Sequence, residues 1–395
     1  MFFFAVPIAE NFFPEHTQPL VNMINAFAIF FIGYLARPFG ALFFGRIGDN
    51  FGRKPALITS ISLMAISTFF LGLLPNYQDI GVWAPILLML LRLLQGFSVG
   101  GELTGSIIFM LEHAPKNQRG FYGSLVGAGT ELGVLLASFF VWLVHYSLST
   151  AAITQWAWRL PFVLGIIGGL VGWFARRSVP ETQLFREVTR MPDSFLTYYR
   201  EYIKYIRHSI VIIGILLFGT VLMYLVYAFS VTYMSNMLSY TSRQALGINI
   251  VSLIFLFLLE PFMGKLSDYI GRRPVMVLAI IGSILFIWPY FWLLQQHDVM
   301  MALAGKLVMT LFAAAYFAVA VVTMVEIVPV QMRFGIVAFA YAVAASIFGG
   351  VTPLIATLLI KLTHSLTSPA YYLVASGLIS LIAIYKVRET RYRLS

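Results

Sequence analysis

Five charged side chains stand inside apolar stretches of the amino-terminal half, where they could bind ions or polar solutes: Arg37, Arg92, Glu102, Glu131 and Arg159. Charged groups in an apolar medium pair with one another or face a cavity, and they commonly mark a path for ions or protons. A guanidinium group can hold a carboxylate through two parallel hydrogen bonds. Three arginines against few acids therefore favour a ligand that carries a carboxylate.

The two glutamates are candidates for binding and releasing a proton. Glu131 lies ten residues into its apolar stretch, on a stripe that Gly123 and Gly127 continue at a spacing of four. Burial and a nearby arginine act in opposite directions on such a carboxyl group, so it can exchange a proton near neutral pH. A glutamate that only locks helices together is the alternative, and both interpretations stay open. For Glu102, close to the end of its stretch, a structural role is favoured.

Aromatic and amide side chains complete the candidate binding site. Tyrosine rings attract a quaternary ammonium group, although packing between helices is the commoner role of any one of them. A carbohydrate site would need many Asn, Gln and Trp side chains in the apolar stretches, and Gln95 alone stands clearly inside one. We therefore expect a small carboxylate or zwitterion as ligand. The ligand-binding candidates are Arg37, Arg92, Gln95, Arg159, Tyr224, Tyr227, Tyr316 and Tyr341.

The composition indicates what kind of molecule must position these groups. Of 395 residues, 60% are apolar and 11% are charged, which is too few charges to coat a soluble globule. The absence of cysteine excludes disulfides and thiolate metal sites. The six histidines lack metal-ligand or His-acid spacing, and no phosphate-binding G-x-x-x-x-G-K-[ST] loop occurs. We expect a membrane protein that is not an enzyme and has no metal and no cofactor.

Eleven apolar stretches are long enough to cross a bilayer as helices of about 20 residues. A twelfth piece, Met1 to Phe13, rises only about 20 Å as a helix against a hydrocarbon core of about 30 Å. This first span is therefore expected to be incomplete, with the natural chain beginning further upstream. The predicted spans are 20–45, 55–74, 84–111, 121–146, 156–175, 208–236, 244–264, 274–295, 301–326, 333–360 and 369–386.

The basic residues orient these spans. With the loop around Arg53 in the cytoplasm, 20 of the 26 Lys and Arg residues are cytoplasmic, as the positive-inside rule requires. The net charge of +10 is then explained without nucleic acid. Both termini are expected in the cytoplasm. Lys306 and Glu260 are expected near span ends, with their charged groups reaching toward the membrane surface.

The two halves of the chain repeat each other. Residues 45–54 read GRIGDNFGRK and residues 264–273 read GKLSDYIGRR, at an offset of 219. The pattern Glu-x-x-Pro-x-x-x-Arg beginning at Glu112 recurs at Glu326, at an offset of 214. Repeated six-span halves are typical of transporters that rock about a central site.

The repeated charges predict a gate on the cytoplasmic side. Asp49 and Asp268 stand where a carboxylate can meet the positive N-terminus of a neighbouring helix. Arginines in the same turns can pair with acids at the ends of neighbouring spans. Polar turns that merely fix the topology are the alternative. The gate candidates are Asp49, Arg53, Glu112, Arg119, Glu181, Asp268, Arg272, Glu326 and Arg333.

These turns resemble the signature of the major facilitator superfamily, and further motifs resemble its metabolite:proton symporter branch. The motifs are RPFG from Arg37, RLLQGFSVGGE from Arg92, EHAPKNQRGFYGS from Glu112, WAWRLPF from Trp156, PET from Pro180, FGGVTP from Phe348 and PAYYLVAS from Pro369. Members of this branch carry proline and betaine, α-ketoglutarate, citrate or shikimate. Two departures are the missing acidic, aromatic patch of span 1 and Gln183 in place of a proline.

The resemblance implies a role for Arg92. In similar facilitators such an arginine pairs with a span 1 carboxylate that carries the proton. That partner is expected upstream of Met1, and the proton carrier is then either this span 1 acid or Glu131, with Glu102 as a further candidate. If the chain begins at Met1, the counter-ion of Arg92 is Glu102, Glu131 or the substrate. The resemblance also implies a bacterial cell inner membrane.

The expected fold is all-α, with twelve spans in two pseudo-symmetric six-helix bundles. We expect domains at residues 1–176 and 208–395, joined by a cytoplasmic linker at 177–207 that contains an interfacial helix. The expected function is proton-coupled symport of a small carboxylate or zwitterion by a monomer in the lipid bilayer. An antiporter or exporter is the closest alternative, and a non-transporting membrane sensor is the next.

Overall fold

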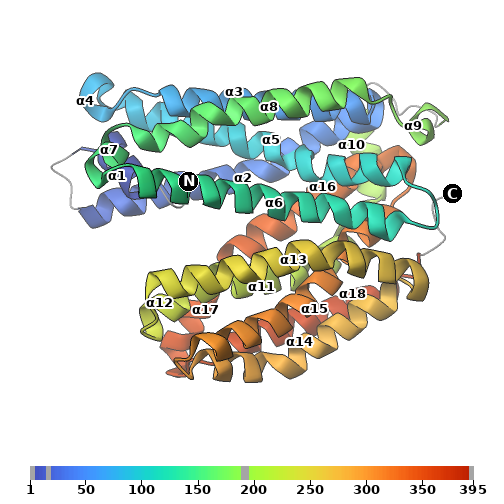
Figure 1. The fold of residues 1–395 in the computed structure, drawn as a ribbon. Coiled ribbons are helices and arrows are strands. Elements are labelled where there is room, and N and C mark those ends of the chain that lie inside the picture. The colour runs from blue at the N-terminus through green and yellow to red at the C-terminus, as the bar shows by residue number, and fades with distance from the viewer. Residues whose placement is uncertain (1–4, 15–18, 188–194, 391–395) are drawn as a thin grey trace.

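The computed structural model describes residues 5–14, 19–187 and 195–390, and every regular element within them is a helix (Figure 1). The first bundle contains α1 (Ala5–Phe12), α2 (Pro19–Asn50), α3 (Arg53–Leu73), α4 (Tyr77–Ile80), α5 (Trp83–His113), α6 (Arg119–Ser147), α7 (Thr150–Gln155), the 3₁₀ turn η2 (Ala157–Arg159) and α8 (Leu160–Ser178). Two short helices follow, α9 (Gln183–Glu187) and α10 (Phe195–Lys204).

The second bundle contains two helices that are interrupted by π-helical turns. Its elements are α11 (Ile206–Met223), η3 (Tyr224–Phe229), α12 (Ser230–Met237), α13 (Ser242–Ile270), α14 (Arg272–Leu294), α15 (Val299–Glu326), η4 (Val330–Met332), α16 (Arg333–Val343), η5 (Ala344–Gly349), α17 (Gly350–Thr363) and α18 (Pro369–Lys386). The π turns η3 and η5 widen the backbone at related places in two long helices, and such turns are frequent at functional sites.

Each of the eleven predicted spans coincides with a helix or with a helix continued through a π turn. Ten helices are long and apolar enough to cross a membrane among the described residues that could be assessed. The helix α2, with 32 residues, covers the predicted span 20–45. The helix α1 has eight residues, so the count of twelve spans stays a prediction.

The two bundles lie side by side with their helices along one common direction (Figure 1). Between the bundles, α6 packs against α13 and α2 packs against α16. The ends of α2, α5, α13 and α15 that carry the repeated motifs meet at one end of the molecule. We call this end the basic end, and the sequence predicts that it is cytoplasmic.

Glycines bring α2 and α5 into backbone contact. A Cβ atom added at Gly40 would lie 1.8 Å from the carbonyl oxygen of Phe97, and one at Gly96 would lie 1.8 Å from that of Gly33. Small residues permit such close packing between membrane helices, where dispersion contacts replace the hydrophobic effect. This packing fixes the relative positions of Arg37 on α2 and Arg92 on α5.

A second pair of glycines explains the repeated motif. Gly52 and Gly271 have φ angles of +120° and +102° and lie immediately before α3 and α14. Only glycine adopts these angles without strain. The turns therefore reverse the chain within two residues and place Arg53 and Arg272 at the first position of the next helix.

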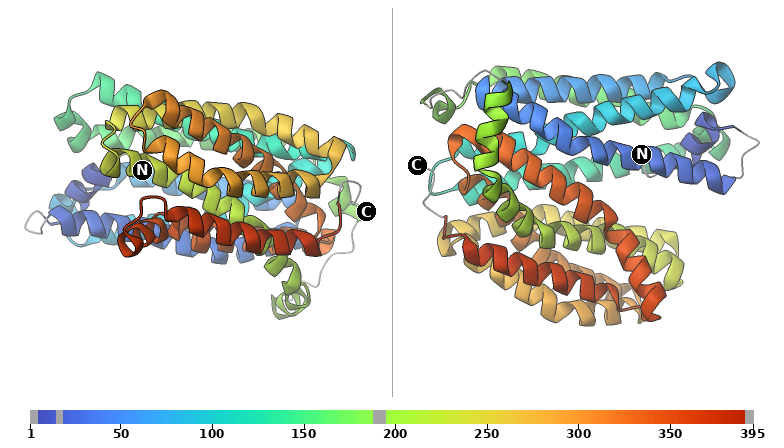
Figure 2. Two further views of the ribbon diagram at one scale, coloured as in Figure 1. Left: turned by 90° about the horizontal axis from the view of Figure 1, so that it is seen from below. Right: turned by 180° about the vertical axis from the view of Figure 1, so that it is seen from behind.

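The linker helix α10 differs from its prediction. It runs across the basic end from one bundle to the other (Figure 2). Its residues Tyr198 and Tyr202 are 1% and 4% exposed, and the ring of Tyr202 lies edge-on to Phe339 at 6.1 Å. The aromatic face of α10 thus contacts protein, whereas an interfacial helix would turn that face toward lipid. The partners of this helix lie in both bundles, because Tyr202 lies against Phe339 and the hydroxyl of Tyr199 donates to the carbonyl oxygen of Leu42.

Candidate functional site

At the basic end, Asp49 joins the two bundles. Its Oδ1 atom accepts a hydrogen bond from the backbone N–H of Phe334 at 2.9 Å, and Oδ2 accepts one from that of Gly335 at 2.9 Å. Both amides lie in the first turn of α16, where the helix dipole is positive. The carboxylate therefore caps a helix of the other bundle, which is the contact that the sequence predicted.

Asp268 makes the mirror contact. Its two carboxylate oxygens accept hydrogen bonds from the backbone N–H groups of Gly120 at 2.8 Å and Phe121 at 2.9 Å. These amides begin α6, so the second bundle caps a helix of the first. Each bundle thus places one carboxylate at the N-terminus of a helix in the other bundle.

Arg53 extends this network within and between the bundles. It is fully buried, and it contacts Asp49 at 3.0 Å and Glu112 at 3.4 Å. Its Nη2 atom also donates to the carbonyl oxygen of Val330 in the second bundle at 2.8 Å. Arg333 of that bundle pairs with the same Glu112 at 3.0 Å. Glu112 is therefore shared by arginines from both bundles.

Arg272 reproduces only part of this arrangement. It contacts Asp268 at 2.8 Å and Glu326 at 3.1 Å, as the repeat predicts. Arg119, the counterpart of Arg333, is buried and is influenced electrostatically by Glu326. Its Nε atom has no hydrogen-bond partner, and within the described ranges Arg119 forms no ion pair within 4.0 Å. The network is consequently stronger on the α2–α16 side than on the α6–α13 side.

Glu181 caps a helix instead of forming an ion pair. It accepts a hydrogen bond from the backbone N–H of Lys54 at 3.0 Å, in the first turn of α3. The next residue, Thr182, donates its hydroxyl to Glu112 at 2.7 Å. Glu181 and Thr182 therefore connect the segment after α8 to α3 and to Glu112.

Sequence reasoning missed the counterpart of this pair in the second bundle. Glu389 accepts hydrogen bonds from the backbone N–H groups of Arg272 at 2.8 Å and Arg273 at 2.9 Å. Thr390 donates its hydroxyl to Glu326 at 2.5 Å. The signal was present, because a Glu-Thr pair recurs after the last helix at an offset of 208.

The linker contributes a further missed residue, Tyr198. Its hydroxyl donates to Oδ2 of Asp49 at 3.0 Å. Burial, together with the Asp49 carboxylate, raises the pKa of Tyr198 well above its ordinary value. The phenol therefore stays protonated and acts only as a donor to Asp49.

Near the middle of the membrane, Arg37 lies among tyrosines. Its guanidinium carbon is 3.9 Å from the centre of the Tyr34 ring. The hydroxyl of Tyr224 donates to that of Tyr34 at 3.4 Å, so η3 of the second bundle meets α2 of the first. Arg37 also acts electrostatically on Tyr341 of α16. Three of the predicted ligand-binding residues are thus brought together, with Tyr34 as an addition.

Arg92 and Gln95 lie inside the first bundle. An Nη1–H group of Arg92 donates to the side-chain oxygen of Gln95 at 2.6 Å, and the amide nitrogen of Gln95 donates to Thr68 at 2.8 Å. This chain links α5 to α3. These two candidates are adjacent to each other, but their described hydrogen bonds stay within one bundle.

Two predicted ligand-binding residues lie apart from this centre. Arg159 donates to the carbonyl oxygen of Leu74 at 3.0 Å and hydrogen-bonds to Asn76, at the end of the bundle opposite the basic end. Its position there indicates a structural role. Tyr316 is fully buried and donates its hydroxyl to the carbonyl oxygen of Ile215 at 2.5 Å, so it packs inside the second bundle.

Glu102 has local partners. It pairs with Arg176 of α8, and the hydroxyl of Ser60 donates to it at 2.6 Å. All three residues belong to the first bundle. This geometry agrees with the structural role that the sequence favoured.

Two residues were wrongly expected to reach toward the membrane surface. Glu260 is 1% exposed and Lys306 is fully buried. The Nζ atom of Lys306 donates to Oδ1 of Asn249 at 2.5 Å and lies 5.6 Å from the centre of the Tyr227 ring. The predicted span 244–264 ended soon after Glu260, whereas α13 continues to Ile270, which places Glu260 deep within the helix.

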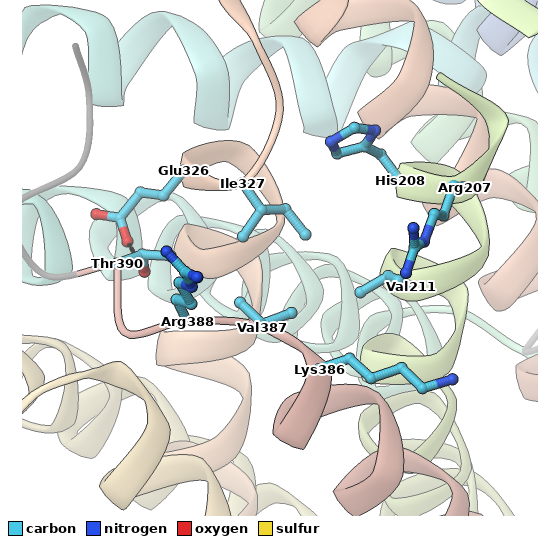
Figure 3. A pocket seen from close by; sticks show the side chains of 9 residues that line it. All are labelled: Arg207, His208, Val211, Glu326, Ile327, Lys386, Val387, Arg388 and Thr390. Atoms are coloured by element: carbon cyan, nitrogen blue, oxygen red, sulfur yellow. Dashed lines mark hydrogen bonds between the residues drawn. The ribbon is translucent and has the colours of Figure 1, made fainter. Parts of the chain in front are cut away.

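A separate cavity of about 410 Å³ lies at the basic end (Figure 3). Glu326 is its one predicted gate residue, and the side chains of Arg207, His208 and Arg388 are distributed around it. The full lining is Arg207, His208, Val211, Glu326, Ile327, Lys386, Val387, Arg388 and Thr390. Across the described residues, no group of three His, Asp or Glu side chains could hold a metal ion.

Comparison with protein families gives two matches. Residues 7–191 match the model of "Sugar (and other) transporter", and residues 239–394 match that of the "Major Facilitator Superfamily". The first match covers the first bundle and the second covers the second bundle from α13 onward.

Among curated proteins, the chain is similar to bacterial transporters. It is 33% identical over 401 residues to the proline/betaine transporter of Escherichia coli K12, covering 99% of this chain and 80% of that protein. It is 34% identical over 398 residues to the glycine betaine/proline/ectoine/pipecolic acid transporter OusA of Dickeya dadantii, covering 98% of this chain and 79% of OusA.

Among solved structures, the chain has the fold of facilitators. The proton:xylose symporter XylE, bound to 6-bromo-6-deoxy-D-glucose, gives a TM-score of 0.79 at 17% identity, covering 99% of this chain and 92% of XylE. FucP in the outward conformation gives a TM-score of 0.70 at 13% identity, covering 97% of this chain and 95% of FucP. The curated relatives are transporters and not enzymes. The chain belongs to the major facilitator superfamily, in its metabolite:proton symporter branch.

Proposed function

We propose that this multi-pass membrane protein takes up a small zwitterion, of the betaine or proline type, together with a proton. The observation that carries the proposal is the position of Arg37 among Tyr34, Tyr224 and Tyr341, contributed by both bundles. Transport then proceeds by alternating access to this centre as the bundles rock about it.

The chemistry of the centre fits both ends of a zwitterion. The Arg37 guanidinium can hold the substrate carboxylate through two hydrogen bonds. Tyrosine faces can attract a quaternary or secondary ammonium group through their electron-rich rings. The relatives are named as transporters of proline and betaine, which supports the same substrate class.

Glu131 is the proposed proton carrier. It belongs to α6, which faces the second bundle, and it acts electrostatically on Tyr227 and Tyr341 across the interface. Glu102 is less suitable because Arg176 neutralises it within the first bundle. A carboxyl group at the bundle interface can respond to both the substrate and the conformation.

The contacts at the basic end are the proposed cytoplasmic gate. The caps by Asp49 and Asp268 and the ion pair between Arg333 and Glu112 join the two bundles. All of them must break before the cytoplasmic side can open. They therefore stabilise the state that is closed to the cytoplasm.

The domain boundaries belong to the same proposal. We assign residues 1–176 and 208–395 to the two moving bundles and 177–207 to the linker between them. The protein would act as a monomer in a bacterial inner membrane, with both termini in the cytoplasm.

Uptake into proteoliposomes tests the proposal. Labelled glycine betaine, proline, α-ketoglutarate and citrate are offered with and without an inside-alkaline pH gradient. We expect betaine or proline to accumulate only with the gradient, and Arg37→Gln to lose this uptake, whereas Arg243→Gln, an exposed arginine outside the centre, retains it. Accumulation that is equal with and without the pH gradient would refute proton symport. Accumulation driven by a counter-substrate would establish an antiporter instead.

A further inference from the structure

Glu260 places its carboxyl group against the opposite bundle. A Cβ atom added at Gly127 of α6 would lie 2.7 Å from Oε2 of Glu260 and 3.5 Å from Oε1. The side chain of Glu260 therefore crosses the α6–α13 interface and occupies the space that the glycine leaves open. Its Oε2 atom is buried and has no hydrogen-bond partner.

Glu131 lies one helical turn beyond Gly127 on α6. Residues four apart share a helix face at a rise of about 6 Å, so Glu131 is adjacent to the carboxyl group of Glu260. The two carboxyl groups interact electrostatically, and both act on Tyr227 and on Tyr341. Glu131 is about 18 Å from the start of α6 and Glu260 about 15 Å from the end of α13, so their depths are similar.

Two basic side chains that lie near or act on the tyrosines beside this pair of acids have other contacts. The Nζ atom of Lys306 donates a hydrogen bond to Asn249, and the guanidinium group of Arg37 lies over the ring of Tyr34. Neither forms an ion pair with Glu131 or Glu260 within the part of the chain that the structure describes. Among the titratable and charged groups of the packed elements, Tyr227 of η3 and Tyr341 of α16 interact electrostatically with both acids. Tyr290 of α14 and Lys306 of α15 act on or lie near Tyr227, and Tyr34 and Arg37 of α2 act on Tyr341.

Two adjacent carboxyl groups in a medium of low dielectric constant cannot both ionise, because their repulsion adds to the desolvation of each. Such pairs hold one proton between them, as the carboxylate dyads of aspartic proteases do. Here the two members come from different bundles. Their separation therefore changes whenever the bundles move.

We propose that Glu131 and Glu260 share one proton across the bundle interface, and that opening of the basic end releases it. A proton from the outer aqueous phase binds to one carboxylate oxygen. When α6 and α13 separate, water reaches both carboxyl groups and takes that proton into the cytoplasm. The inference rests on proton symport as proposed above and adds the second bundle's own proton-binding group.

The test compares Glu131→Gln, Glu260→Gln and the double variant in proteoliposomes. The control is Glu201→Gln, because Glu201 is half-buried on α10 and pairs with Lys204 of the same helix. Counterflow of labelled substrate at equal pH needs no net proton movement, whereas accumulation driven by a pH gradient does. We expect each single variant to retain counterflow and lose accumulation entirely. The double variant should be no worse than either single one, because the pair acts as a unit.

The outcomes separate the two proposals. Loss of accumulation in Glu131→Gln with normal accumulation in Glu260→Gln would overturn the pair and leave symport standing. Normal accumulation in both variants would overturn the pair, and Glu131 would no longer be the carrier. Loss of counterflow in a folded, monodisperse Glu260→Gln protein would overturn the pair in favour of a substrate contact.

Infrared spectroscopy gives a readout that a purely structural role would not change. A protonated carboxyl group has its own C=O stretching band. We expect this band in the purified protein, and as the pH is raised we expect it to disappear at a lower pH in Glu131→Gln and in Glu260→Gln, because the remaining carboxyl group no longer meets a second acid. A band that disappears at the same pH in Glu260→Gln as in the unchanged protein would contradict the shared proton.

Discussion

At the scale of single residues, Arg37 is the proposed contact of the substrate carboxylate. Arg37→Lys keeps the charge but removes the planar fork that can hold a carboxylate through two bonds. We expect KM for betaine to rise about tenfold, about 1.4 kcal/mol, with a smaller change in kcat. Uptake kinetics measure this, and Arg243→Lys is the matched control. An unchanged KM would place the carboxylate elsewhere.

Tyr198 gives a prediction about pH. Tyr198→Phe removes the hydrogen bond to Asp49, and a bond to a charged group contributes about 1.5–3 kcal/mol. Because the pKa of Tyr198 is raised well above its ordinary value, the phenol is neutral below that value and donates throughout the working range. The decrease in melting temperature should therefore be the same at about pH 8 and about pH 10. A decrease confined to the lower pH would show that the phenol ionises.

At the scale of elements, the glycine contacts between α2 and α5 determine stability. Gly96→Ala would place a methyl group 1.8 Å from the Gly33 carbonyl oxygen, so the helices must move apart. Overpacking of this kind costs about 1–3 kcal/mol. Gly129→Ala on α6 meets no atom within 4 Å and should be neutral or stabilising. Thermal unfolding in detergent compares the two variants, and equal melting temperatures would contradict the close contact.

The helices could be predicted from the sequence because hydropathy records burial in lipid directly. The gate could be predicted because its charges are repeated: Asp49 and Asp268 both cap helices of the opposite bundle. The burial of Glu260 and Lys306 could not be predicted, because hydropathy gives the length of a span but not which of its sides faces a neighbouring helix. Tyr34 and Tyr198 were missed for the same reason, since their partners are distant in sequence.

At the scale of the whole molecule, the proposed gate predicts that the contacts at the basic end set the balance between conformations. Asp49→Asn loses a charged cap on α16 and should favour opening of the basic end by about 1 kcal/mol. Since the chain has no cysteine, Lys116→Cys and Lys265→Cys can carry spin labels on opposite bundles without background labelling. We expect the population of long distances to increase in Asp49→Asn and to stay constant in Glu201→Gln. An unchanged distribution would contradict the gate.

The unequal contacts of Arg333 and Arg119 have a mechanical consequence. Arg333 of α16 pairs with Glu112 of α5 beside the α2–α16 edge, whereas among the described residues Arg119 forms no ion pair beside the α6–α13 edge. The two edges should therefore resist separation to different degrees. The bundles should therefore part by tilting, with the α6–α13 edge leading and the α2–α16 edge serving as a hinge. Glu131 and Glu260 lie at the leading edge, so water would reach them early in the tilt. The unequal contacts at the two edges would then set the order of events. The proton would leave first, and the substrate would be released to the cytoplasm second.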